Sequence, residues 1–267
     1  MSDPIRYWQT LTTTEAAAIA ARDPVVVLPL AATEQHGPHL PLSTDHDIGI
    51  GLLREAFAQL SGDVSVWVLP AQTIGASREH LRFAGTLSFD PELLTEAIYQ
   101  QGAALAACGV QRLVLFNSHG GNLPLMDTAA LRLRDEHGIL VVKASYVTFS
   151  RPDDVELPEA EWRHGLHGGA VETAMMLHLR PDLVRTGALQ RFPSLGQELD
   201  APLRRLGPEG EASFAWLAGD LNPHGVTGNT RLADADTGQR LVAHYGRVLA
   251  EVIHETGAFP LDRLIGR

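Results

Sequence analysis

The sequence of 267 residues contains a single cysteine and no run of lysines and arginines. One cysteine, Cys108, cannot form an internal disulfide, which is typical of a reducing compartment, and we expect it to be a small buried hydrophobic residue. Lys and Arg number 21 against 32 Asp and Glu, which gives a formal net charge of −11. Nucleic acid and anionic membrane surfaces are therefore disfavoured as partners.

Long hydrophobic runs are also missing. The longest, residues 24–32, is far shorter than the roughly 20 residues of a membrane-spanning helix, and the N-terminal residues lack a basic segment followed by an apolar one. We therefore expect a cytoplasmic protein without a membrane partner. With 45% hydrophobic and 20% charged residues, the chain can bury a sizeable core, and we predict one domain over residues 1–267.

Short apolar segments alternate with amphipathic ones along the first half of the chain. Strands are predicted at residues 25–30, 64–69, 112–116 and 139–144. Helices are predicted at residues 47–59, 91–107, 124–136, 174–179 and 234–255. This alternation is typical of an α/β protein with a mainly parallel sheet covered by helices. Such sheets bind ligands at the carboxyl ends of their strands.

Polar residues follow the first predicted strand directly. Glu34, His36 and Asp45 lie in a segment that contains Gly37 and Pro38, and imidazole with carboxylates is a ligand set for Zn²⁺, Mn²⁺ or Fe²⁺. The alternative is a solvated loop with a helix cap at Thr44 or Asp45.

Two further segments place histidine beside glycine. Residues 117–122 contain His119 followed by two glycines, and residues 164–173 contain His167 and Glu172. Taken separately, the first is compatible with a tight strand-to-helix turn, and the second with a capping histidine and an ordinary salt-bridged glutamate. Together the three segments indicate a metal-assisted hydrolase, with His167 as a general acid or base.

The sequence also resembles the creatininase family of metal-dependent amidohydrolases, which includes a formamidopyrimidine deformylase and the mycofactocin-precursor peptidase. The matching residues are Thr33–Leu42, Thr44-Asp45, Glu79-His80, Gly85–Ser88, His119–Asn122, His167–Gly169 and Glu172-Thr173. These residues occur in the family's order and span most of the chain.

This resemblance implies a three-layer α/β/α sandwich that assembles as a homohexamer and holds one or two divalent ions, with Zn²⁺ expected first and Mn²⁺ or Fe²⁺ as alternatives. The implied metal ligands are Glu34, His36, Asp45, His119 and Glu172. Asp45 would bridge two ions, and His167 would be catalytic in proton transfer, beside Glu172. The implied activity is hydrolysis of a non-peptide or cyclic amide or amidine C–N bond in a small molecule by a metal-activated water.

One departure from the family limits the prediction of substrate. Creatininase itself has a Glu ligand at the position of Gly121, so creatinine is doubtful as a substrate and a second ion is less certain. We expect residues 190–216 to contribute to specificity, and Trp216 to serve in packing. Open alternatives are an iron enzyme acting on a C–C bond of a sugar-derived ketone, a peptidase of a modified precursor peptide, and a non-catalytic binding module.

Overall fold

The computed structural model describes residues 3–60 and 64–265. Its central sheet consists of β1 (Val25–Leu30), β2 (Val66–Val68), β3 (Arg112–Asn117) and β4 (Leu140–Ser145). The strands lie in the order β2-β1-β3-β4, and every neighbouring pair is parallel. The predicted parallel sheet is confirmed, although β2 is shorter than the sequence pattern indicated.

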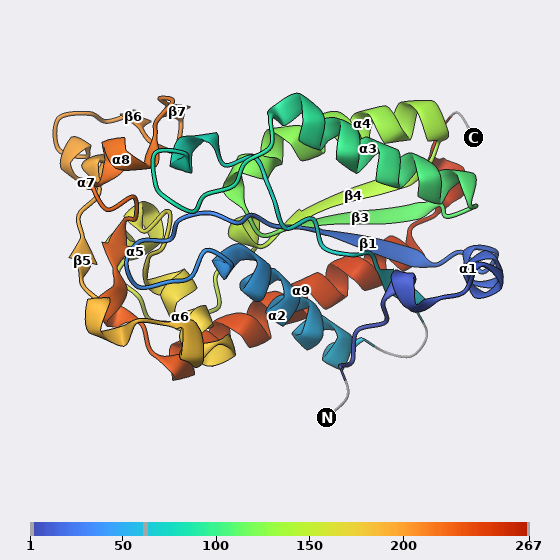
Figure 1. Cartoon of the computed structure of the whole chain (residues 1–267), viewed down its shortest axis with the longest axis horizontal. Helices are drawn as coiled ribbons and strands as arrows, with labels where there is room; N and C mark the ends of the chain where they lie inside the picture. Colours follow the sequence, from blue (N-terminus) through green and yellow to red (C-terminus); the bar gives the residue numbers. More distant parts are fainter. Residues whose placement is uncertain (1–2, 61–63, 266–267) are drawn as a thin grey trace.

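Helices cover both faces of this sheet (Figure 1). The helices are α1 (Thr13–Ala20), α2 (Thr44–Gln59), α3 (Pro91–Ala107), α4 (Leu123–His137), α5 (Glu159–His164), α6 (Ala170–Leu179), α7 (Leu195–Leu199), α8 (Ala218–Leu221) and α9 (Ala235–Ala258). Helices α3 and α4 pack together on one face, and α2, α6 and α9 pack together on the other. This is the expected three-layer α/β/α arrangement.

Alternation along β1 explains why both faces need cover. Val25 and Val27 belong to the core beneath α2, α6 and α9, whereas Val26, Leu28 and Leu30 belong to the core beneath α3 and α4. Since successive strand residues point to opposite faces, a strand that is apolar throughout can be buried only between two layers.

The predicted burial of Cys108 is wrong. The cysteine is exposed because α3 ends at Ala107 and the chain turns at Gly109, whose φ is +99°. Val110 then returns to the core, where it is 1% exposed.

Two long connecting segments contain only short elements. Residues 149–158 are irregular until α5 begins at Glu159. Residues 190–216 hold α7, a two-residue strand β5 (Arg191–Phe192) that pairs with β8 (Gly228–Asn229), and the small pair β6 (Leu206–Gly207) and β7 (Ala212–Ser213).

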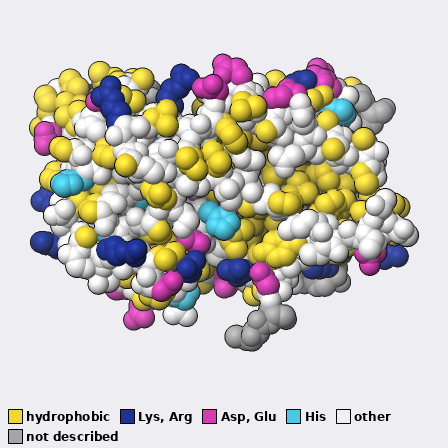
Figure 2. All heavy atoms as spheres, viewed as in Figure 1, with side chains coloured by type: hydrophobic (Ala, Val, Ile, Leu, Met, Phe, Trp, Pro, Cys, Tyr) yellow, Lys and Arg dark blue, Asp and Glu magenta, His cyan; other side chains and the backbone are white. Residues whose placement is uncertain are grey.

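In the part of the chain that the structure describes, no helix combines the length and apolar character needed to cross a bilayer. On the face shown in Figure 2, Lys and Arg side chains are scattered and do not gather into one patch.

Candidate metal centre

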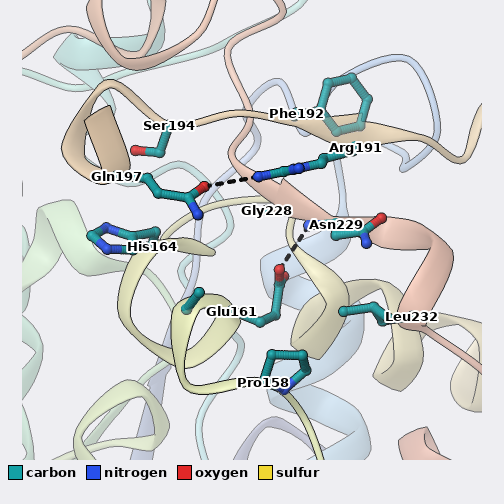
Figure 3. Close-up of a pocket in the computed structure, with 11 residues that line it drawn as sticks. Pro158, Glu161, His164, Arg191, Phe192, Ser194, Gln197, Gly228, Asn229 and Leu232 are labelled. Atoms are coloured by element: carbon teal, nitrogen blue, oxygen red, sulfur yellow. Dashed lines mark hydrogen bonds between the residues drawn. The ribbon is translucent and has the colours of Figure 1, made fainter. Parts of the chain in front are cut away.

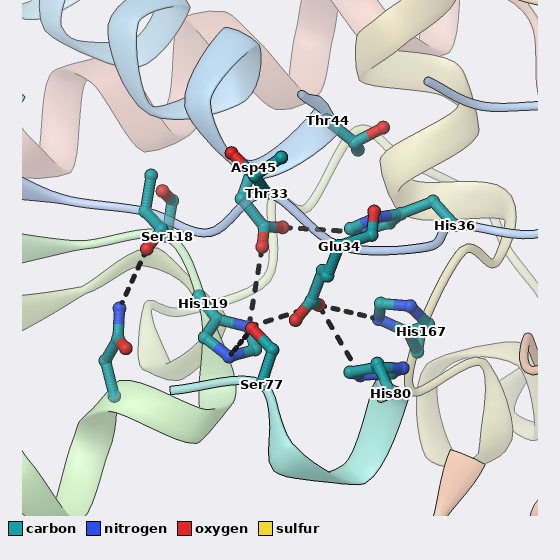
Figure 4. Close-up of polar contacts among 12 residues, drawn as sticks. Thr33, Glu34, His36, Thr44, Asp45, Ser77, His80, Ser118, His119 and His167 are labelled. Atoms are coloured by element: carbon teal, nitrogen blue, oxygen red, sulfur yellow. Dashed lines mark hydrogen bonds and ion pairs between the residues drawn. The ribbon is translucent and has the colours of Figure 1, made fainter. Parts of the chain in front are cut away.

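The residues predicted from three separate segments meet at the carboxyl edge of the sheet (Figure 4). Strands β1 and β3 are neighbours, and their last residues, Leu30 and Asn117, are paired in register. The segments that carry Glu34 and His119 therefore leave the sheet side by side. Helix α2 contributes Asp45, and the start of α6 contributes Glu172 next to His167.

Asp45 differs from the sequence-based alternative of a loop residue or helix cap. It is the second residue of α2 and is 2% exposed, and Ser43 occupies the N-cap position. Leucine and isoleucine residues along α2 pack this helix against the sheet, so its first turn is drawn into the interior. The buried position makes Asp45 available to the centre and costly to leave without a compensating charge.

Asp45 belongs to one group of candidate ligand atoms and lies next to a second. Glu34, Asp45 and His119 place one atom each within 4.8 Å of one another, and so do His36, His167 and Glu172. Asp45 Oδ2 lies 3.4 Å from His119 Nδ1, and Asp45 Oδ1 lies 3.2 Å from His36 Nε2. Each oxygen of Asp45 thus faces a different group, which is the arrangement of a bridging carboxylate.

Backbone carbonyls orient the three imidazoles. His36 Nδ1 lies 3.1 Å from Glu34 O, His119 Nε2 lies 2.9 Å from Ala76 O, and His167 Nε2 lies 2.7 Å from Gln35 O. A carbonyl only accepts hydrogen bonds, so each of these nitrogens donates. The other nitrogen of each ring faces inward, an orientation commonly found in metal-binding histidines.

Several of the inward-facing atoms are buried without a hydrogen-bond partner among the described residues. These atoms are both carboxylate oxygens of Glu34, Asp45 Oδ2 and His36 Nε2. Buried polar atoms are nearly always satisfied in folded proteins. A divalent cation satisfies carboxylate oxygens and imidazole lone pairs together, so the donor set fits a metal such as Zn²⁺, Mn²⁺ or Fe²⁺.

Without a cation, protons compensate the carboxylates. Burial lowers the pKa of His36, but the carboxylates of Asp45, Glu172 and Glu34 together outweigh it and raise this pKa to about 9. Burial likewise opposes the charge on His119, and Glu34 raises its pKa to about 10. Burial raises the pKa of Asp45 to about 6 despite the nearby His36. The metal-free centre therefore holds protons where an ion would bind.

Two neutral donors hold Glu172, whose Oε2 also lies 3.9 Å from His36 Nε2. Its Oε2 accepts a hydrogen bond from Gly168 N at 2.6 Å, and its Oε1 accepts one from Tyr146 Oη at 3.1 Å. Burial raises the pKa of Tyr146 well above its usual value, and Glu172 adds to this effect, so the phenol keeps its proton. The carboxylate is held in place while its negative charge remains available to the centre.

A separate polar pocket lies beside the start of α6 (Figure 3). Its buried carboxylate, Glu161, accepts hydrogen bonds from Ala170 N at 2.7 Å and from Asn229 N at 2.7 Å. These bonds tie the N-terminus of α6 to β8. Glu161 therefore supports the helix that carries Glu172, and we assign it a structural role.

Gly121 occupies the position at which the resemblance to creatininase itself implied a Glu ligand. A Cβ atom there would lie 2.2 Å from Ala76 O, 2.6 Å from His119 Nε2 and 2.9 Å from Glu79 Oε1. No side chain can start from this position unless the backbone shifts. The absence of a carboxylate at residue 121 is thus built into the packing around His119.

Gly121→Ala is expected to lower metal affinity about 10- to 100-fold. The added Cβ pushes Ala76 O away from the His119 ring, and losing a hydrogen-bond partner of a metal ligand typically has an effect of this size. Gly120→Ala is the matched control, since nothing lies within 4 Å of the added Cβ, and it should bind metal like the wild type. A competitive metal titration measures both variants. Equal affinities would show that the Ala76–His119 contact does not support binding.

His80 is a member of the centre to which the sequence analysis gave no role. It is 2% exposed, and its Nε2 lies 3.5 Å from Glu34 Oε1. Burial lowers its pKa to about 2. The sequence contains Glu79 and His80 side by side after β2, but this spacing matches no motif of metal ligands.

The chain is similar to several known proteins of one family. The family model described as creatininase, or creatinine amidohydrolase, matches residues 9–253. The mycofactocin precursor peptide peptidase of Mycobacterium tuberculosis is 35% identical over 234 residues, which are 85% of this chain and 84% of that protein. The creatinine amidohydrolase of Pseudomonas putida is 31% identical over 63% of this chain and 69% of that protein. A solved structure titled "Creatininase Mn" superposes with a TM-score of 0.76 at 27% identity, covering 94% of this chain and 98% of that one.

Proposed function

The chain belongs to the creatininase family of hydrolases, and we propose that it is a divalent-metal-dependent hydrolase of a non-peptide or cyclic amide or amidine C–N bond. The observation that carries the proposal is the group of buried, unpartnered carboxylate and imidazole atoms around Asp45. Glu34, Asp45 and His119 would hold one ion, and His36, Asp45 and Glu172 would hold a second. Zn²⁺ is the ion we expect first, with Mn²⁺ or Fe²⁺ as alternatives.

The protein's own residues supply the remaining parts of the reaction. When bound, a divalent ion supplies a Lewis acid and a water that is deprotonated near neutral pH. His167 donates its Nε2–H to Gln35 O, so the lone pair of Nδ1 is available 3.7 Å from Glu34 Oε1. We assign Nδ1 to accept the proton of the nucleophile and return it to the leaving nitrogen.

A peptide bond is the second candidate substrate. It is favoured by the 35% identity to a protein named as a precursor peptide peptidase. A panel of a lactam, a formamide, a linear amide and short peptides, assayed by amine release with each metal, distinguishes the two. Turnover of the lactam or formamide but not of peptides supports the proposal, whereas turnover of peptides alone would replace it with the second candidate.

Metal affinity is expected to increase steeply with pH. An incoming ion must displace protons from His36 and His119, whose pKa values in the metal-free protein are about 9 and about 10. Below these pKa values, two displaced protons raise the apparent affinity by up to about 100-fold per pH unit. Calorimetric titration of Mn²⁺ at pH 7.5, in two buffers of different ionisation enthalpy, should show release of about two protons per site pair. A titration without proton release would show that both rings are already neutral.

We further propose that the chain acts on a small molecule in the cytoplasm as a homo-oligomer, with the hexamer expected from its family. Part of the apolar segment 214–218 is covered within the chain, since Trp216 Nε1 donates a hydrogen bond to Pro208 O at 3.2 Å. Ala215 remains exposed. The intrachain bond of Trp216 agrees with the packing role expected for it.

A further inference from the structure

The side chain of His80 lies at the centre of the site between Gln35 and Glu34, on the short helical turn Arg78–His80 (Figure 4). Its Nδ1 is 2.8 Å from Gln35 Nε2. Which of these two atoms carries the shared hydrogen decides what the opposite nitrogen, Nε2, can do in the site.

Two backbone groups fix the orientation of the Gln35 amide. Its Oε1 accepts a hydrogen bond from Gly37 N at 3.0 Å, and its Nε2 donates one to Gly225 O at 2.6 Å. A flipped amide would place oxygen against the carbonyl of Gly225 and NH₂ against the N–H of Gly37. The NH₂ group therefore also faces His80.

This orientation sets the tautomer of His80. Because Gln35 Nε2 donates, His80 Nδ1 must accept, and the ring hydrogen is then on Nε2. That Nε2–H points toward Glu34 Oε1 at 3.5 Å and Glu79 Oε1 at 3.8 Å. Both distances exceed the roughly 2.7–2.9 Å of a strong hydrogen bond to a carboxylate, so the donor is not committed to either one.

His80 thus differs from the other three rings of the site. As neutral rings, His36, His119 and His167 use their N–H on a backbone carbonyl and turn a lone pair inward, whereas neutral His80 turns an N–H inward. A nitrogen that carries hydrogen has no lone pair for a metal. The group Glu34, His80 and His167, although its atoms lie close together, is therefore not a metal site.

We propose that His80 is a catalytic hydrogen-bond donor, whose Nε2–H binds the amide oxygen of the substrate as negative charge develops on it. The His80 and His167 rings stand side by side, with centroids 4.2 Å apart. The neutral His80 ring therefore presents an N–H donor beside the neutral His167 ring, which presents a nitrogen lone pair as an acceptor. His80 transfers no proton in this role and stays neutral. The role rests on the amide hydrolysis proposed above, but the tautomer does not.

His80→Phe and His80→Gln test the proposal. His80→Phe keeps a ring but removes the donor, and it should retain full metal stoichiometry and bind substrate with a similar KM. Its kcat should fall about 10²- to 10³-fold, as when an oxyanion donor is removed. His80→Gln restores an N–H donor and should recover part of kcat. His254→Gln, on the exposed side of α9, is the control and should behave like the wild type.

The tautomer is measured independently of activity. Nitrogen-15 spectra of histidine-labelled, Zn²⁺-loaded protein, with the His80 signal assigned from its absence in His80→Gln, should show hydrogen on Nε2 and none on Nδ1. Hydrogen on Nδ1, a Zn²⁺-bound Nε2, or loss of metal from His80→Phe would overturn the donor role. If wild-type protein hydrolyses none of the amides in the panel, the proposed function fails, while the spectrum still decides whether His80 is a donor.

Discussion

Asp45→Asn is expected to lower the affinity of the centre for divalent metal by more than about 100-fold. Asp45 is placed to contribute one oxygen to each group of ligands. Loss of a ligand shared by both groups should lower metal affinity more than the 10- to 100-fold decrease that follows the loss of a residue hydrogen-bonded to a ligand. The fold should survive. Burial raises the pKa of Asp45 to about 6 despite the nearby His36, so the neutral amide removes the cost of burying a carboxylate in the metal-free protein.

Asp47→Asn is the matched control for this substitution. Asp47 lies in the same turn of α2, but its carboxylate accepts a hydrogen bond from Ser43 Oγ at 2.7 Å and faces Arg180. Elemental analysis of both folded variants measures the effect. Normal metal content in Asp45→Asn would remove Asp45 from the ligand set.

His167→Ala is expected to lose roughly 10²- to 10⁴-fold in kcat, the range typical of general acid–base catalysis, with near-normal metal content. The wild-type kcat should fall in acid as His167 becomes protonated. Burial lowers the pKa of His167 to about 4. The base is therefore neutral and active above about pH 4, and activity that depends on it is lost as the pH falls through that value.

The pH profile and the metal content separate the possible roles of His167. His167 Nδ1 also lies in the group with His36 and Glu172 that can hold an ion. Loss of metal together with activity would reassign His167 as a ligand. Unchanged kcat on a true substrate would show that His167 has only a structural role at the start of α6.

The sequence was informative about the layers and about most of the centre. Strand β1 is apolar throughout, and Glu34 and His36 follow it closely. The same stretch of sequence therefore predicted both a buried strand and the position of the site. The pairing of β1 with β3 then brought His119 alongside. Because parallel strands end at one edge, these candidate ligands could be grouped before any distance was known.

Other features depend on contacts that sequence spacing does not contain. The role of His80 follows from the Gln35 amide, which is oriented by Gly225, 190 residues away. The need for glycine at position 121 comes from the carbonyl of Ala76. Asp45 looked like a loop residue because the hydrophobic pattern of α2 begins at Ile48, whereas the helix itself begins at Thr44.

Reconstitution of the metal-free protein tests the central claim most directly. Protein stripped with a chelator is titrated with Zn²⁺ or Mn²⁺ while amine release from the best amide of the panel is followed. We predict no hydrolysis without metal, and activity that increases in proportion to bound ion until the sites around Asp45 are full. Undiminished hydrolysis by metal-free protein would contradict a metal-dependent amide hydrolase.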